Sequence, residues 1–361
     1  MAGLTEVRAP EVRYEIMDAL RGIAAVAVVF YHFGSRLGLP ETVAHGYLAV
    51  DFFFMLSGFV LAHAYTRKLS SLSVARFALI RAVRLLPMSV FGVLIGTAYF
   101  LLRWKIQNAS SDSVLQILGA SGLNLALIPK LWSAGATKDE VFPADGVLWS
   151  LSFEFLINVA WAAGLIRLKP QVQLGIAFIG AMVMIYYIWE IGNANLGWNW
   201  STYVGGLGRT VFGFLIGLIL WRYRPIVRPS GIKPLLVTAL LILALSLPLI
   251  SRIYEIVVVI LIFPLIIYLA ASADFGAESA FVKFLADISY PLYAVHLPIL
   301  MALSGTLKLF TRNGSHPPAF LYALSVPIIL LAWCLGHWYE LPARRWLERL
   351  FLQKRPLQAP A

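Results

Sequence analysis

An arginine and a histidine stand eleven residues apart in the first apolar run of the sequence. Arg21 and His32 lie within residues 17–34, whose other side chains are mostly apolar. On an α-helix, which advances about 100° and 1.5 Å per residue, the two side chains share one face within about 20° and lie about 16 Å apart. Ionisable side chains inside a membrane span are costly and commonly mark a functional path. The pair therefore predicts a polar path through a bilayer.

Among the further ionisable side chains within apolar runs, three are candidates for the same path. Asp51 lies near the start of the second run, Glu154 near the start of the fourth, and His296 near the middle of the ninth. A histidine beside a carboxylate can act as a general base, because it titrates near neutrality and the carboxylate orients its ring. His32 is thus a candidate base, with Asp51 or Glu154 as its orienting carboxylate. Structural explanations remain open: an interfacial residue for His32, a helix cap for Asp51 and a core histidine for His296.

A basic stretch precedes the third apolar run and is expected to form a short helix on the membrane surface. Arg81 and Arg84 are three residues apart and share a helix face, whereas Arg76 lies about 140° round the helix from Arg81. The planar guanidinium group pairs well with phosphate oxygens. These arginines therefore predict a site for a phosphate-bearing ligand. The alternative is that they only keep this loop on the cytoplasmic side, as the positive-inside rule describes. Arg21 also has a local explanation, an ion pair with Asp18 three residues earlier.

The composition is that of an integral membrane protein. Hydrophobic residues make up 60% of the 361 positions and charged residues only 13%, against about 45–50% and about 25% in soluble proteins. The net charge of +11 is therefore assigned to membrane topology, and no nucleic-acid partner is expected. The single cysteine, Cys334, excludes an internal disulfide and a cysteine-cluster metal site, and no metal is expected. The first apolar run has no cleavage pattern after it and is expected to remain as a signal anchor.

Ten apolar runs approach the length of about 20 residues that a transmembrane helix needs. They cover approximately residues 17–35, 47–65, 85–102, 147–167, 171–189, 203–221, 234–251, 254–272, 288–307 and 318–338. An eleventh run, 114–128, is short and interrupted by glycine and polar residues. If it does not cross and the N-terminus is inside, 19 of the 29 Lys and Arg residues are cytoplasmic, as the positive-inside rule requires. The sequence predicts an all-α integral membrane protein with about ten transmembrane helices and cytoplasmic termini. Residues 103–146 then form an outer loop with a short or re-entrant helix.

Six motifs, in order along the chain, resemble those of the acyltransferase-3 family, multi-span membrane enzymes that acylate cell-surface glycans. They are Arg21 with His32, Asp51–Phe59, Arg76 to Pro87, Trp149–Glu154, Ser289 to His296, and Glu340-Leu341-Pro342. Each motif alone is weak, but together they cover about residues 14–350. One departure is Phe155, which stands where the family often has a second acidic residue, so that Glu154 must act alone.

The resemblance implies a single transmembrane acyltransferase domain over residues 1–350, followed by a basic cytoplasmic tail over 351–361. It implies an O-acyltransferase of the plasma membrane, expected to be a bacterial inner membrane, that uses cytoplasmic acyl-CoA, most often acetyl-CoA, and has no permanently bound cofactor. The acceptor is expected to be a hydroxyl of an extracytoplasmic saccharide, polysaccharide or glycolipid. The donor-binding residues are then Arg21, Arg81, Arg84 and His296, and the catalytic residues His32, Glu154 and Asp51. Whether His32 acts as a base or accepts the acyl group stays open.

Other classes of protein remain possible from the sequence. A polytopic transporter or flippase could line a substrate path with the same polar residues, although the internal repeat common in transporters is missing. An inactive relative and the membrane-bound O-acyltransferases of a different fold are further alternatives. No appended hydrolase-like domain is seen, so transfer is expected to finish in the membrane domain or on a partner. Four outer aromatic residues could stack on sugars or belong to the interfacial belt: Trp132, Trp198, Trp200 and Tyr203.

Overall fold

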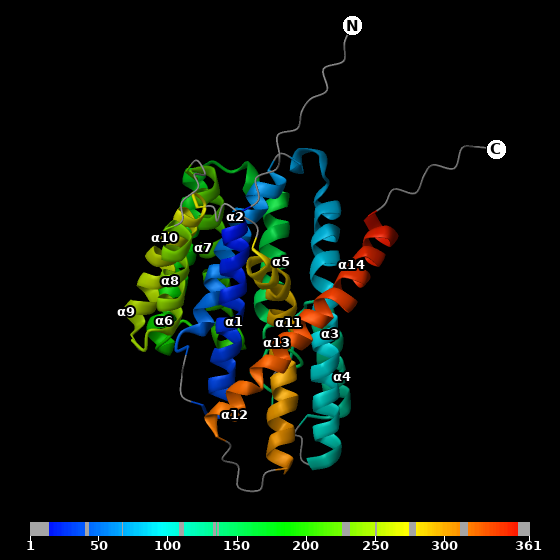
Figure 1. Cartoon of the computed structure of the whole chain (residues 1–361). Helices are drawn as coiled ribbons and strands as arrows, with labels where there is room; N and C mark the ends of the chain where they lie inside the picture. The colour runs from blue at the N-terminus through cyan, green and yellow to red at the C-terminus, as the bar shows by residue number, and fades with distance from the viewer. Residues whose placement is uncertain are drawn as a thin grey trace, which may run out of the picture.

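The protein is a bundle of α-helices (Figure 1). A computed structural model describes residues 14–39, 43–66, 68–107, 112–132, 135, 137–225, 232–249, 251–273, 279–310 and 317–352. Within these ranges there is no β-strand, and one antiparallel bridge joins Glu140 to Asn199. The predicted all-α fold class is confirmed.

The helices follow the predicted apolar runs. In chain order they are α1 (Glu15–Leu37), α2 (Ala49–Tyr65), α3 (Val74–Gln107), α4 (Val114–Leu125), α5 (Leu148–Ala163), α6 (Pro170–Ile191), α7 (Tyr203–Arg222), α8 (Ile232–Ser246), α9 (Arg252–Val257), α10 (Phe263–Ala270), α11 (Ala280–Phe310), α12 (Pro318–Ala323), α13 (Ser325–Leu335) and α14 (Leu341–Leu347). Short π-helical segments join α9 to α10 and α13 to α14, and a third follows α14. These junctions produce longer continuous rods.

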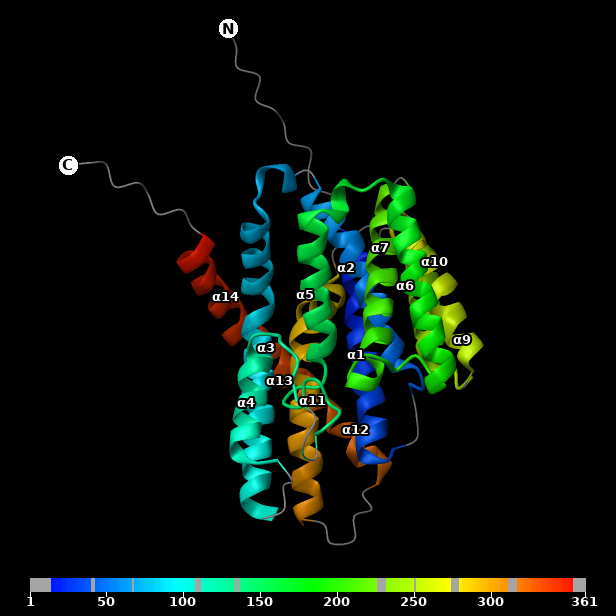
Figure 2. The same ribbon diagram turned by 180° about the vertical axis from the view of Figure 1, so that it is seen from behind.

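Eight helical segments of the described chain are long and apolar enough to cross a membrane. They coincide with eight of the ten predicted spans, and the other two are the shorter helices α5 and α8. The chain is therefore a multi-pass membrane protein, while the count of ten and the side of each terminus stay predictions. Helix α4 has 12 residues and is about 18 Å long, well short of the roughly 30 Å hydrocarbon core. It packs beside the second half of α3 (Figure 2).

The prediction of a separate surface helix over the basic stretch is wrong. Helix α3 runs without interruption for 34 residues and includes Arg76, Arg81 and Arg84 as well as Pro87. Membrane helices tolerate proline where neighbouring groups bond the local backbone. Here Tyr290 donates to the carbonyl of Leu85, and Tyr339 donates to that of Pro87 at 3.1 Å. The arginines are consequently fixed to a transmembrane rod.

Close helix pairs build the core of the bundle. Helix α1 packs along α11, α2 along α7, α7 along α6, and α3 along α11. In the α2–α7 pair the backbones approach at glycines: a Cβ on Gly58 would collide with the carbonyl of Phe214, and one on Gly217 with the carbonyl of Met55. Small residues permit this packing in membranes, where no hydrophobic force drives helices together.

The last rod, from α12 through α14, crosses the outside of the bundle obliquely (Figure 1). It exposes Trp338, Trp346 and Phe351, as expected for a surface that faces lipid. Arg76 of α3 donates hydrogen bonds to the carbonyls of Phe351 and Leu352 and so fixes its far end. Most of the predicted tail, residues 353–361, lies outside the described residues.

Candidate active site

Two cavities lie within the bundle and have different linings. The first, of about 270 Å³, contains four arginines, Arg21, Arg81, Arg84 and Arg344, and we call it the arginine cavity. The second, of about 280 Å³, contains His32, and we call it the histidine cavity. The arginine cavity lies where α1 and α3 begin, and the histidine cavity lies toward the end of α1. The predicted topology places the first on the cytoplasmic side.

The arginine cavity brings together Glu154 and the three arginines that the sequence singled out. Arg81 donates from Nη2 to Oε1 of Glu154 at 3.1 Å, and Ser57 donates to the same oxygen at 2.9 Å. Arg21 donates from Nε to Ser289 at 3.0 Å and forms the expected ion pair with Asp18 at 3.1 Å. Because guanidinium groups from three segments converge here, the cavity suits a ligand with several negative charges.

Arg344 is a member of this cluster that the sequence analysis missed. Helix α14 places it at the wall of the arginine cavity. A neighbouring cavity of about 190 Å³ shares Arg21, Arg84 and Arg344 with the first and also reaches Glu340. The cluster therefore extends over two adjoining spaces. A signal existed in the Glu-x-Pro motif, because Glu340 lies about one helical turn before Arg344.

His32 and His296 meet at the histidine cavity. Their ring centroids are 5.2 Å apart, with the planes inclined by 36°. Nδ1 of His296 lies 3.1 and 2.9 Å from the carbonyls of Leu292 and Tyr293. Since a carbonyl only accepts, Nδ1 carries a hydrogen and Nε2 of the neutral ring keeps its lone pair. Nε2 is buried with no hydrogen-bond partner in the described part of the chain, so a nitrogen that can accept a hydrogen bond lies beside His32.

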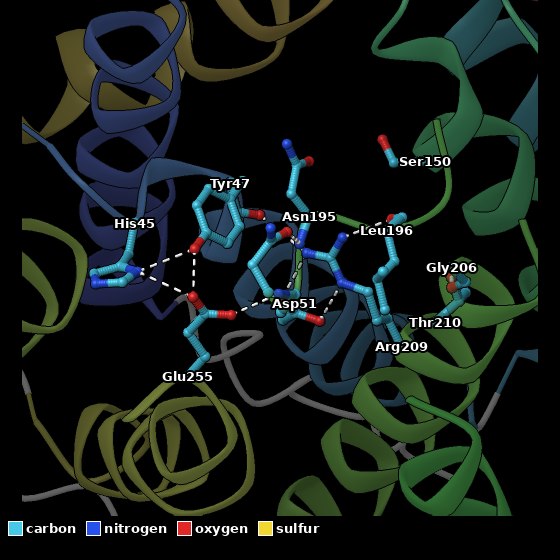
Figure 3. Close-up of polar contacts among 12 residues, drawn as sticks. His45, Tyr47, Asp51, Ser150, Asn195, Leu196, Gly206, Arg209, Thr210 and Glu255 are labelled. Carbon is cyan, nitrogen blue, oxygen red and sulfur yellow. Dashed lines mark hydrogen bonds and ion pairs between the residues drawn. The ribbon is translucent and has the colours of Figure 1, made fainter. Parts of the chain in front are cut away.

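Asp51 is engaged in a buried ion pair rather than placed against His32. Arg209 of α7 donates to both carboxylate oxygens, at 2.9 Å from Nε and 2.6 Å from Nη2, and both side chains are fully buried. Arg209 also donates to the carbonyls of Leu196 at 2.8 Å and Tyr47 at 3.0 Å (Figure 3).

The structure therefore does not bring the predicted orienting carboxylates to the histidine. Asp51 is bonded to Arg209, and Glu154 lies in the other cavity. Among the described residues, neither forms a hydrogen bond with His32. The position of a residue along an apolar run indicates how deep it lies in the membrane. The neighbours that its side chain contacts depend on how the helices pack. The catalytic roles of Asp51 and Glu154 stay predictions.

A second polar network fixes the rim of the histidine cavity (Figure 3). Tyr47 donates to Oε1 of Glu255 at 2.6 Å, and Oε2 of Glu255 accepts from the backbone N–H of Ala194 at 2.5 Å. The loop that follows Ala194 carries Asn195 and Trp198, which line the cavity. Glu255 therefore holds this loop over the cavity, a role that the sequence analysis did not identify.

The loop between α4 and α5 adds acidic groups. Glu140 lines the histidine cavity, and burial raises its pKa although Arg36 opposes the shift. Burial also raises the pKa of Asp145, whose Oδ1 accepts from the N–H of Val147 at 3.4 Å. Within the described ranges, no group of three or more His, Cys, Asp or Glu side chains is arranged to hold a metal ion.

Comparisons with known proteins agree with the motifs. The family model for an acyltransferase domain, that of the acyltransferase-3 family, matches residues 14–337. Protein 2 in the picA locus of Rhizobium radiobacter is 30% identical over 185 residues, which are 49% of this chain and 96% of the relative. No solved structure matches.

Two other relatives have names that include an activity. One, from Komagataeibacter xylinus, is named as a membrane-bound transacylase and is 27% identical over 59% of this chain and 52% of its own length. Another, from Staphylococcus aureus, is named as an O-acetyltransferase and is 24% identical over 48% of this chain and 30% of its own length. The matched segments are thus about half and a third of these longer relatives. Since the family model covers most of the chain, the protein belongs to the acyltransferase-3 family and is a membrane acyltransferase.

Proposed function

We propose that the protein transfers an acyl group, in the first instance acetyl, from cytoplasmic acyl-CoA to a hydroxyl of an extracytoplasmic saccharide or glycolipid. The observation that carries this proposal is the pair of cavities, one rich in arginine and the other lined by His32, whose ring lies against that of His296. The name of the Staphylococcus aureus relative supports an acetyl group on oxygen.

The arginine cavity is proposed to hold the phosphates of the donor. Coenzyme A carries phosphate groups at one end and the thioester at the other end of a long flexible arm. Arg21, Arg84 and Arg344 line both adjoining spaces and can bind phosphates, while Arg81 is held by Glu154 deeper in the wall. The arm then extends toward His32 and delivers the thioester.

His32 is proposed to act as the base. The acceptor oxygen attacks the thioester carbonyl carbon, its proton moves to His32, the carbon–sulfur bond breaks, and the proton then neutralises the departing thiolate. An acyl-histidine intermediate is the alternative, in which the imidazole nitrogen attacks first. In both routes the His296 lone pair can accept a hydrogen bond near the reacting groups. Asn195, Trp198 and Arg209 line the space for the acceptor.

The proposal is tested by CoA release from acetyl-CoA by the purified protein in liposomes, with a surface-glycan fraction as acceptor. We expect His32→Ala to lose glycan-dependent release by about 10²–10⁴-fold, the usual contribution of a general base. His63→Ala is the matched control, because His63 lines neither cavity. Near-normal release by His32→Ala would contradict the mechanism. Glycan movement without CoA release would instead favour the transporter or flippase.

A further inference from the structure

The two cavities approach each other at two side chains. Val50 of α2 and Tyr293 of α11 line both the arginine cavity and the histidine cavity, and no other lining residue is shared. The exposed fractions of these residues are only 7% and 5%. These two buried side chains therefore stand between the cavities and separate them at this point.

Tyr293 is fixed in the wall from several sides. Its hydroxyl lies 2.5 Å from Oγ of Ser150, and Phe53 packs edge-on against its ring with centroids 5.3 Å apart. Its ring centroid is 6.0 Å from that of His296. On α5, Trp149 lines the histidine cavity whereas the adjacent Ser150 lines the arginine cavity. The Ser150–Tyr293 bond therefore lies at the boundary between the two spaces.

We propose that Tyr293 is the specificity-determining residue of the acyl transfer and selects short acyl groups. The inference rests on the function proposed above, because an acyl group carried from the arginine cavity to His32 must pass Tyr293 and Val50. The aromatic ring stands between the two cavities, and its tether to Ser150 limits how far it can turn aside to open a passage. A small acyl group passes this point, whereas a longer chain is obstructed.

Thiol labelling tests the wall without any turnover. In a Cys334→Ser background, Ala64→Cys introduces a single thiol in the arginine cavity, because Ala64 lines that cavity only. The probe is a methanethiosulfonate carrying a trimethylammonium group, added to one side of sealed vesicles. The side that gives rapid labelling is the arginine-cavity side.

We expect labelling from the opposite side to be slow and to accelerate at least about tenfold in Tyr293→Ala. Tyr290→Ala is the matched control: Tyr290 lies one turn earlier on α11 and lines the arginine cavity but not the histidine cavity. Val50→Ala widens the same passage from its other side and replaces Tyr293→Ala if that variant does not fold. Equal acceleration by Tyr290→Ala, or none by Tyr293→Ala and Val50→Ala, would overturn the assignment of the wall.

Donor selectivity provides the second measurement. Initial rates with acetyl-, butyryl- and hexanoyl-CoA are compared between the unmodified chain and the two tyrosine variants. We expect Tyr293→Ala to raise the hexanoyl-to-acetyl rate ratio about tenfold and Tyr290→Ala to leave that ratio unchanged. An unchanged ratio in Tyr293→Ala would overturn the specificity role. Absence of turnover by the unmodified chain with every donor would instead count against the proposed function, while the labelling result would still report on the wall.

Discussion

The ion pair between Arg81 of α3 and Glu154 of α5 lies in the lining of the arginine cavity, the candidate donor site. The side chains of Arg81 and Glu154 are only 8% and 19% exposed, so the pair is poorly screened by solvent. Removal of a charged hydrogen bond of this kind costs about 1.5–3 kcal/mol. We therefore expect Arg81→Ala to raise the KM for acetyl-CoA by about tenfold or more, as both a positive charge and the restraint on Glu154 are lost.

Steady-state CoA release at varied acetyl-CoA concentration measures this effect. Arg81→Lys keeps the charge but not the fork geometry and should recover part of the affinity. Arg224→Ala is a suitable control, because Arg224 lies on the surface beside Trp221 and lines neither cavity. A KM for Arg81→Ala equal to that of the unmodified chain would show that Arg81 is not part of the donor site.

The Asp51–Arg209 pair is expected to stabilise the fold. Both side chains are fully buried and joined by two hydrogen bonds. Breaking a buried pair leaves an uncompensated charge and costs about 3–5 kcal/mol. Asp51→Ala should therefore markedly lower the thermal stability of the purified protein in detergent, followed by tryptophan fluorescence.

An exposed ion pair offers the comparison for Asp51→Ala. Arg344 and Glu348 are 36% and 40% exposed, and such pairs contribute at most about 1 kcal/mol. Glu348→Ala should consequently change the melting temperature little. A stability of Asp51→Ala similar to that of Glu348→Ala would indicate that Asp51 is not held as the structure describes.

At the scale of the elements, the fit of α2 against α7 positions both cavities. Gly58 and Gly217 allow the two backbones to approach, and Val50 and Asp51 on α2 depend on that placement. Gly58→Leu should separate the helices and cost about 1–3 kcal/mol from overpacking, or more. Folded yield by size-exclusion chromatography and the melting temperature measure this loss. Gly175→Leu, on an open face of α6 with no atom within 4 Å of its Cβ position, is the control and should be tolerated.

The apolar runs of the sequence predict where the helices lie better than they predict which neighbours the side chains contact. The apolar runs locate the helices because about 20 apolar residues suit only a membrane span, and charge asymmetry separates the short α4 from the longer spans. The surface helix over Arg76–Arg84 was wrongly predicted, because the backbone continues through Pro87 into the membrane. Nothing local to the sequence indicates that carbonyls near Pro87 are bonded by hydroxyls more than 200 residues away.

The candidate site shows the same division. Arg21, Arg81, Arg84 and Glu154 do meet in one cavity, and His32 does meet His296. Asp51 was expected beside His32 as a candidate orienting carboxylate, but its partner is Arg209, 158 residues later in the chain. Tyr293 and Arg344 gain their importance only from the packing of α11 and α14. Such long-range pairings require the folded arrangement.

At the scale of the whole molecule, the two cavities predict a reaction with a fixed direction. In sealed vesicles, free CoA should appear on the side of the arginine cavity, and the O-acyl product on the side of the histidine cavity. A membrane-impermeant thiol dye added to one side and then to the other measures CoA release. The labelling of Ala64→Cys defines the orientation independently. Release of CoA on the side of the histidine cavity would contradict this arrangement.

The arginine cavity also has a metabolic consequence. If the donor is acyl-CoA, as proposed, its phosphates and those of the released CoA are chemically the same, and the same arginines would bind both. Acyl-CoA and free CoA would then compete for the arginine cavity, and the rate of acyl transfer would depend on the ratio of acyl-CoA to free CoA in the compartment that this cavity faces. Through this competition, the rate of acylation of the acceptor would rise and fall with the supply of acyl-CoA in that compartment.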